Sequence, residues 1–145
     1  MFTHLIETQI HIRASAERVW SVLTDFEHYP QWNPFVRQIS GDLREGGVLS
    51  VAVQPVGGPG MLFRPRLLTV QPQRALVWRG RLLMPGVFDG AHSFLLGPDA
   101  EGVTLIHQER FSGLLVPLLH RSLEHGTRQG FEAMNEALRK RVESA

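Results

Sequence analysis

The chain has 145 residues, of which 43% are hydrophobic and 20% are charged, so it suits a single globular domain over residues 1–145. Its 15 basic and 14 acidic residues leave a formal net charge of +1, and no overall field favours nucleic acid or an anionic membrane as a partner. The absence of cysteine excludes disulfides, thiolate metal sites and cysteine nucleophiles. The start MFTHLIETQI does not resemble a signal peptide, and no apolar run is long enough to span a bilayer. We therefore expect a cytoplasmic protein without integral membrane insertion.

The first elements can be placed from their periodicity. Isoleucines alternate with polar residues from Phe2 to Ile12, which predicts a half-buried strand. Ser15 is a suitable N-cap for a short helix that ends near Thr24. The segment Asp25–Pro34 contains prolines that forbid one continuous helix, so it predicts a broken turn with a second short helix. Two aromatic residues of this segment suit either the core or a pocket wall, namely Tyr29 and Trp32.

The segment from Val36 to Phe111 carries glycine or proline turn signals about every ten residues, which is typical of an antiparallel meander. Pro65 cannot donate to a sheet ladder, so we expect a bulge or an exposed edge there. The predicted strands are Arg37–Gly41, Val48–Gln54, Met61–Gln71, Ala75–Met84, Ala91–Leu96 and Val103–Phe111.

The longest regular pattern runs from Gly113 to Glu143. Apolar residues recur at steps of three and four, so this segment predicts one amphipathic helix, packed against the curved sheet over residues 114–142. Gly126 and Gly130 fall on the packed side, where they indicate either close contact between helix and sheet or a pocket left by the missing side chains. The opposite side should carry helical ion pairs, Glu124 with Arg128 and Glu136 with Lys140.

Five short stretches are distinctive enough for comparison with known families: Ala16–Trp20 (AERVW), Tyr29–Phe35 (YPQWNPF), Phe88–Phe94 (FDGAHSF), His107–Gly113 (HQERFSG) and Gly130–Asn135 (GFEAMN). With the order of the elements, they resemble the helix-grip fold of the START-like superfamily, also called SRPBCC, in its bacterial polyketide cyclase/dehydrase-like branch. The resemblance implies an α+β fold, with a curved antiparallel sheet of about seven strands wrapped on the C-terminal helix and two short helices after the first strand. It also implies an apolar cavity between sheet and helix. It does not assign catalytic residues, because the superfamily holds carriers, receptors and enzymes.

Motifs for metal, nucleotide and hydrolase sites are missing from the sequence. The seven histidines include no His-x-His pair and no His-Glu-x-x-His run, so we expect no metal site. Gly57–Gly60 precedes a predicted strand, whereas a phosphate-binding loop requires a helix N-terminus. No serine has a Gly-x-Ser-x-Gly context, and no basic-aromatic array suits nucleic acid. We therefore expect no cofactor and no nucleic-acid partner.

The candidates for acid–base chemistry are His92, His107 and Glu109. They fall on the apolar faces of two strands that should form a hairpin, so the three polar groups should cluster. His92 would face His107 across a loop of about six residues, or Glu109 across a loop of about four. The cluster is either a satisfied structural pair or a group that orients a ligand or moves a proton, and the sequence leaves both interpretations open.

Three functions are compatible with these patterns. The first is binding, transport or sequestration of a small apolar ligand, such as a lipid, an isoprenoid or an aromatic polyketide, in a cavity of roughly several hundred Å³. The second is a cyclase- or dehydratase-type enzyme that uses the buried His or Glu for proton transfer in that cavity. The third is a protein-docking domain, as in chaperone co-factors of the superfamily.

The chain would act as a monomer or a homodimer. The residues expected to bind the ligand are Tyr29, Trp32, Phe63, Trp78, His92, Phe94, Glu109, Gly126, Gly130 and Met134.

Overall fold

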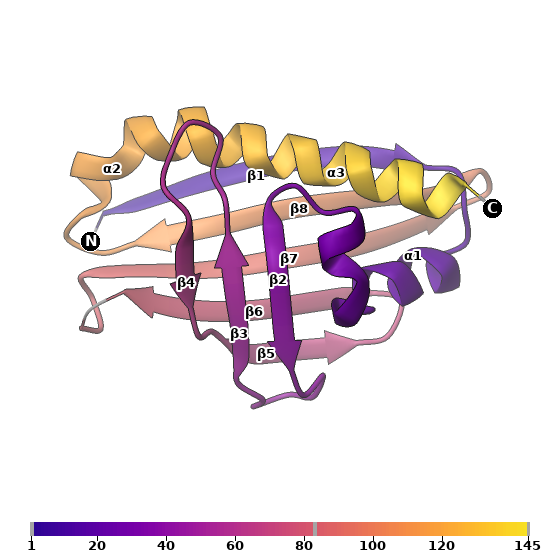
Figure 1. The fold of residues 1–145 in the computed structure, drawn as a ribbon, viewed down its shortest axis with the longest axis horizontal. Helices are drawn as coiled ribbons and strands as arrows, with labels where there is room; N and C mark the ends of the chain where they lie inside the picture. The colour runs from indigo at the N-terminus through magenta and orange to yellow at the C-terminus, as the bar shows by residue number, and fades with distance from the viewer. Residues whose placement is uncertain (1, 83, 145) are drawn as a thin grey trace.

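A computed structural model describes residues 2–82 and 84–144 and shows strands wrapped around a long C-terminal helix (Figure 1). The predicted α+β helix-grip architecture is confirmed. In chain order the elements are β1 (Thr3–Ile12), α1 (Ala16–Leu23), η1 (Phe26–Gln31), β2 (Val36–Gly41), β3 (Leu49–Val53), β4 (Met61–Phe63), β5 (Arg66–Gln71), β6 (Ala75–Leu82), β7 (Phe88–Asp99), β8 (Gly102–Ser112), α2 (Val116–Ser122), η2 (Leu123–Thr127) and α3 (Arg128–Glu143).

The split helical segment after β1 forms as its sequence indicates. The hydroxyl of Ser15 accepts a hydrogen bond from the backbone N–H of Arg18 and so caps α1. The element η1 is a 3₁₀ helix that contains Pro30. Within this segment Tyr29 is fully buried, and its hydroxyl donates to the carbonyl of Leu23. Tyr29 therefore ties the segment to the core.

The strands divide into a five-stranded set in the order β1-β8-β7-β6-β5 and a three-stranded set in the order β2-β3-β4. In Figure 1 the second set crosses in front of the first. The predicted single strand Met61–Gln71 is wrong, because the chain breaks before Pro65 and the two halves become β4 and β5 in different sets. The sets stay joined, since Leu49 N donates to Pro65 O at 2.8 Å and Val48 bridges to Arg66.

The hairpin of β7 and β8 is longer than predicted. The two strands pair without interruption from Asp89 and Ser112 to Asp99 and Gly102, so only Ala100 and Glu101 form the turn. His92 lies directly opposite Glu109 in this register. The expected loop of about four residues for that pairing was wrong, because pairing continues beyond Leu96. The strand β6 ends at Leu82, whereas the predicted strand ended at Met84. Met84 lies in a bend, so the predicted end is wrong there, and residue 83 lies outside the described residues.

The C-terminal helix runs as α2, η2 and α3, and its apolar face is buried as predicted. The element η2 is a π-helical turn around Gly126. Such turns are uncommon and are frequent at functional sites. The buried side chains that hold the helix on the sheet are Val116, Leu123, Phe131, Met134, Leu138 and Val142.

Gly126 and Gly130 are sites of close contact, and the pocket alternative is wrong for both. A Cβ at Gly126 would lie 2.7 Å from the backbone oxygen of Val56, in the loop between β3 and β4. A Cβ at Gly130 would overlap the ring of Phe35. The glycines therefore let a loop and an aromatic ring approach the helix.

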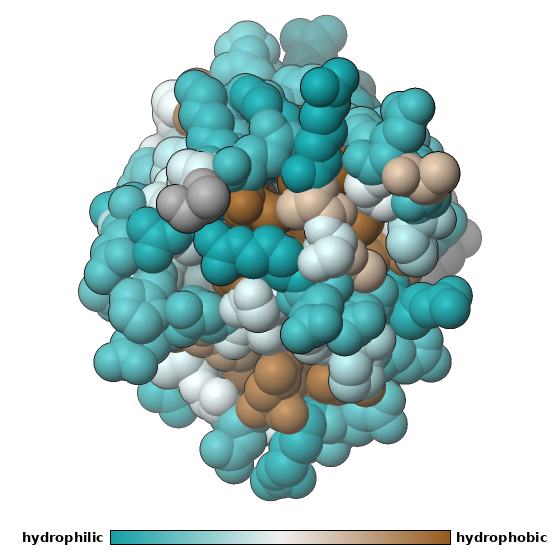
Figure 2. Space-filling model, turned by 90° about the vertical axis from the view of Figure 1, so that its right-hand side faces the viewer, coloured by the Kyte–Doolittle hydropathy of each residue, from teal (hydrophilic) through white to brown (hydrophobic). Residues whose placement is uncertain are grey.

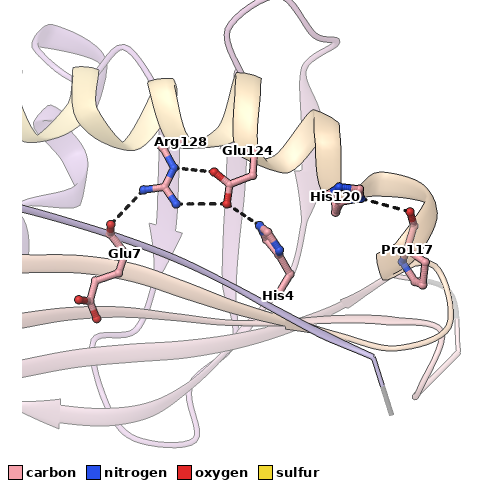
Figure 3. A network of polar contacts seen from close by, with 6 residues as sticks. All are labelled: His4, Glu7, Pro117, His120, Glu124 and Arg128. Atoms are coloured by element: carbon pink, nitrogen blue, oxygen red, sulfur yellow. Dashed lines mark hydrogen bonds and ion pairs between the residues drawn. The ribbon is translucent and has the colours of Figure 1, made fainter.

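A partly exposed polar network, which we call the outer clamp, joins β1 to the helix (Figure 3). Glu124 accepts hydrogen bonds from Arg128, the shortest at 2.7 Å, and lies 2.7 Å from Nε2 of His4. Arg128 also donates to the carbonyl of Glu7. The Arg128 hydrogen bond, followed by that of His4, holds the pKa of Glu124 below its ordinary value. The predicted Glu124–Arg128 pair is confirmed, whereas Glu136 pairs with Arg139 instead of Lys140.

The two ends of the molecule differ in surface character. At the end where α2 begins, backbone hydrogen bonds join Gly113 to Phe2 and Leu114 to Gly86, and Leu114 and Leu118 are highly exposed. The opposite end, with α1 and the C-terminus, is mostly hydrophilic (Figure 2). No helix within residues 2–82 and 84–144 is both long and apolar enough to span a bilayer.

Candidate functional site

An apolar cavity of about 80 Å³ lies between the inner face of the sheets and η2. Its wall also contains four polar side chains, Arg81, His92, Glu109 and Thr127. The volume is smaller than the expected several hundred Å³, because aromatic side chains fill most of the space between sheet and helix. The apolar side chains of its wall include Val36, Val53, Phe63, Phe88, Phe111 and Leu123.

Three neighbouring strands place one row of side chains on the cavity wall. Trp78 of β6 pairs with His92 of β7, and His92 pairs with Glu109 of β8. The indole of Trp78 stacks on the imidazole of His92, with 4.9 Å between ring centroids. Within residues 2–82 and 84–144 the buried indole N–H of Trp78 has no hydrogen-bond partner. All three residues of the row line the cavity.

The predicted cluster of His92, His107 and Glu109 is confirmed as a geometric fact. Nδ1 of His92 lies 3.1 Å from Oε1 of Glu109, and Nε2 of His92 lies 2.7 Å from Nε2 of His107. Because these nitrogens face one another, they do not converge on a common point. In the described part of the chain no group of three or more His, Asp or Glu side chains is placed to hold a metal ion.

The cluster extends into the core through two residues that sequence analysis missed. Nδ1 of His107 lies 2.8 Å from Oδ1 of Asn135 in α3, and Nδ2 of Asn135 donates to the hydroxyl of Thr8 in β1 at 2.9 Å. The hydroxyl of Thr8 donates to the carbonyl of His107 at 2.8 Å. We call Glu109, His92, His107, Asn135 and Thr8 the buried chain.

Local patterns do contain a signal for both missed residues. Asn135 lies four positions after Phe131 on the packed face of α3, and Thr8 shares the inward face of β1 with Ile6 and Ile12. A polar residue at an apolar position of such a pattern must find a buried partner.

The buried chain has a strongly apolar environment. His107 is fully buried, and its ring stacks on Phe131 with 4.1 Å between centroids and lies 4.4 Å from Phe94. Burial, followed by the charge of His92, holds the pKa of His107 well below its ordinary value, although the hydrogen bond to Asn135 acts in the opposite direction. His107 is therefore a neutral imidazole in the folded protein.

Gly90 makes the room that Glu109 occupies. A Cβ at Gly90 would overlap Oε2 of Glu109, so the carboxyl group lies over the bare backbone of β7. The side chain of Glu109 keeps 14% of its surface exposed, against 3% for His92. Glu109 is thus the member of the pair that is more accessible from outside.

Only part of the predicted ligand-binding set lines this cavity. Phe63, Trp78, His92 and Glu109 do. Trp32 instead lines an open polar groove with Arg18 of α1, His28 of η1 and Arg141 of α3, which we call the outer groove. The remaining five lie elsewhere, in core packing or close backbone contacts: Tyr29, Phe94, Gly126, Gly130 and Met134.

Comparison with known proteins agrees with this geometry. Residues 3–143 match the family described as polyketide cyclase/dehydrase and lipid transport. The chain belongs to this family. The match covers nearly the whole chain and confirms the resemblance to the SRPBCC superfamily. No curated protein matches the chain by sequence.

Solved structures share the fold of this family member at low sequence identity. The Zhui aromatase/cyclase from Streptomyces sp. R1128 has a TM-score of 0.80 at 20% identity, over 98% of this chain and 94% of that one. Norcoclaurine synthase from Thalictrum flavum has a TM-score of 0.74 at 16% identity, over 97% and 94%. The di-domain ARO/CYC StfQ of the steffimycin biosynthetic pathway has a TM-score of 0.78 at 12% identity, over 97% of this chain but only 51%, about half, of StfQ.

Proposed function

We propose that the chain binds a small, largely apolar molecule in the cavity, with one neutral polar group of the ligand directed to Glu109. The observation that carries this proposal is an apolar cavity whose wall contains the carboxyl group of Glu109, hydrogen-bonded to His92 through Oε1. The family supports it, because polyketides and lipids are both largely apolar. An isoprenoid or an aromatic polyketide would satisfy the same chemistry.

The size of the cavity limits how such a ligand enters. Its volume of about 80 Å³ is near half of the roughly 150 Å³ that holds benzene in an engineered protein cavity. Binding of even one aromatic ring therefore requires wall side chains to move. The half-buried Phe63 and the exposed Met61 line the cavity from β4, a short strand at the edge of its set, so we expect these two side chains to move.

Phenol and toluene form a matched pair of probes, because they have similar size and only phenol has a hydroxyl. We expect both to bind in NMR titrations, phenol more tightly. Val53→Phe should abolish binding by filling the cavity, whereas Val48→Phe adds the same ring at an exposed position and should leave binding intact. Equal loss in both variants, or no loss in Val53→Phe, would refute the cavity as the binding site. Native mass spectrometry after gentle purification would then identify any natural ligand.

The contact between Glu109 and His92 favours a second candidate, a cyclase- or dehydratase-type enzyme. A carboxyl group hydrogen-bonded to an imidazole in a cavity wall can remove a proton from a ligand and return it. Acting on a ketone, Glu109 would take a proton from the carbon beside the carbonyl. The C–H electron pair would form the enolate double bond, and the carbonyl π pair would move to oxygen. Return of a proton to carbon completes the cycle.

Acetophenone in D₂O tests this second candidate. The protein should accelerate exchange of its methyl hydrogens for deuterium, and Glu109→Gln should remove the acceleration while toluene still binds. If exchange is the same with and without the protein, the site binds ligands without this chemistry.

A further inference from the structure

The hydrogen bonds of the buried chain have one donor-to-acceptor direction, which can be established from the end of the chain at Thr8. The Thr8 hydroxyl gives its only hydrogen to the carbonyl of His107, so its oxygen accepts from Nδ2 of Asn135. The amide oxygen of Asn135 then faces Nδ1 of His107 at 2.8 Å. Because an amide oxygen can only accept, Nδ1 of His107 carries a hydrogen.

The same donor-to-acceptor order continues through the imidazoles of His107 and His92. His107 is neutral, so its Nε2 has no hydrogen and must accept. Nε2 of His92, at 2.7 Å, is therefore the donor. This leaves Nδ1 of His92 facing Oε1 of Glu109 at 3.1 Å.

If Nδ1 of His92 carried no hydrogen and Glu109 were a carboxylate, two lone pairs would face each other. One hydrogen must therefore lie between Nδ1 of His92 and Oε1 of Glu109. The pair is then either imidazolium with carboxylate or imidazole with carboxylic acid, and it is neutral overall in both forms. If His107 carried its hydrogen on Nε2 instead, His92 would carry its own on Nδ1 as a neutral ring, and the pair would be an anion. The tautomer of His107 therefore determines the charge at the cavity wall.

We propose that Thr8 and Asn135 are positioning residues, which fix the tautomer of His107 and thereby keep the pair of His92 and Glu109 neutral overall at the cavity wall. This inference rests on the proposed function for its ligand consequence: the outer oxygen of Glu109 accepts a hydrogen bond from a ligand hydroxyl, and the neutral pair can both take and release a proton. Neither residue touches the cavity, so both act through His107.

The test is the tautomer of each histidine, read from long-range ¹H–¹⁵N NMR correlations of the wild-type protein without ligand. We expect His107 to carry its hydrogen on Nδ1 and His92 to carry one on Nε2. Thr8→Val keeps the shape of the side chain and removes the hydroxyl, so Asn135 loses its fixed orientation and His107 should become a mixture of tautomers. Thr8→Ser keeps the hydroxyl and should retain the wild-type pattern.

Phenol affinity provides the functional readout. Thr8→Val should change the affinity for phenol by a factor of roughly 2 to 10, because the charge of the acceptor at Glu109 changes, and should leave toluene affinity unchanged. A wild-type spectrum with the His107 hydrogen on Nε2 would overturn the proposal, whether or not the variant folds. So would an unchanged His107 tautomer in Thr8→Val. If phenol does not bind the wild type, the proposed function fails, and the tautomer result still decides the positioning role.

Discussion

Two polar networks join β1 to the C-terminal helix, and they differ mainly in burial. In the outer clamp His4 and Arg128 surround Glu124, whose side chain is 39% exposed. In the buried chain the four inner members are at most 8% exposed, and His107 is held neutral among aromatic rings. The outer clamp thus uses opposite charges that water already stabilises, whereas the buried chain depends on hydrogen bonds between groups that are removed from water. Burial makes each hydrogen bond of the inner network far costlier to lose.

The largest expected effect comes from breaking the buried chain in its middle. Asn135→Ala removes the acceptor of His107 Nδ1 and the donor to Thr8, so two buried groups lose a partner. We expect the free energy of unfolding to fall by about 3 kcal/mol. Urea denaturation measures it, and a loss below about 1 kcal/mol would show that the chain is not a stabilising network.

Both networks require the helix to lie close to its neighbours, and this can be tested at its glycines. Gly126→Ala places a methyl group against the backbone oxygen of Val56, whereas Gly130→Ala meets the ring of Phe35, a side chain that borders the cavity and has space there to shift. Overpacking should exceed the gain in helix propensity, so we expect Gly126→Ala to lose roughly 1–2 kcal/mol and Gly130→Ala less. A Gly126→Ala protein more stable than the wild type would contradict the close contact.

The two networks should respond to acid in different pH windows. The pKa of His107 is depressed in the folded state, so below about pH 6.5 only the unfolded chain takes up this proton, and stability falls as pH falls. The slope from one such group is about 1.4 kcal/mol per pH unit. His107→Gln should flatten the stability profile between about pH 5 and 6.5, and the exposed control His125→Gln should not. Equal slopes in both variants would assign the acid sensitivity to another group.

The smallest effect is expected in the outer clamp. The pKa of Glu124 is depressed, so its contribution is present above its unfolded value near 4.5 and is lost as pH falls through the folded pKa. Glu124→Gln should cost less than about 1 kcal/mol at neutral pH, and high salt should remove most of it. Asn135→Ala should be insensitive to salt. A large, salt-independent loss in Glu124→Gln would remove the distinction between the two networks.

Sequence periodicity predicted most of the strands, the C-terminal helix and the cluster of His92, His107 and Glu109, and the family resemblance supplied the helix-grip fold. Alternation assigns each residue of a strand to one face, and a hairpin brings two such faces together. The link from Asn135 to Thr8 joins residues 127 positions apart, in α3 and β1. No local pattern sets that distance, because it depends on how the helix lies on the sheet.

The cavity was harder to predict than the cluster within it. Gly130 fits a pocket or a close contact equally well on a helical face, and the ring of Phe35 from another part of the chain decides between them. Aromatic residues such as Phe94 and Trp32 also suit a pocket wall by type. Phe94 packs against His107 and Trp32 lies in the outer groove, and both placements follow from tertiary packing.

The most direct test of the account is to locate phenol on the protein by intermolecular NOEs, using ¹³C- and ¹⁵N-labelled chain. If the cavity is the binding site, the phenol ring protons will show contacts to Val53, Phe88 and Phe111, and the side-chain signals of Glu109 and His92 will shift. Contacts confined to the outer groove at Trp32 and Arg141, or an absence of binding at any site, would contradict it.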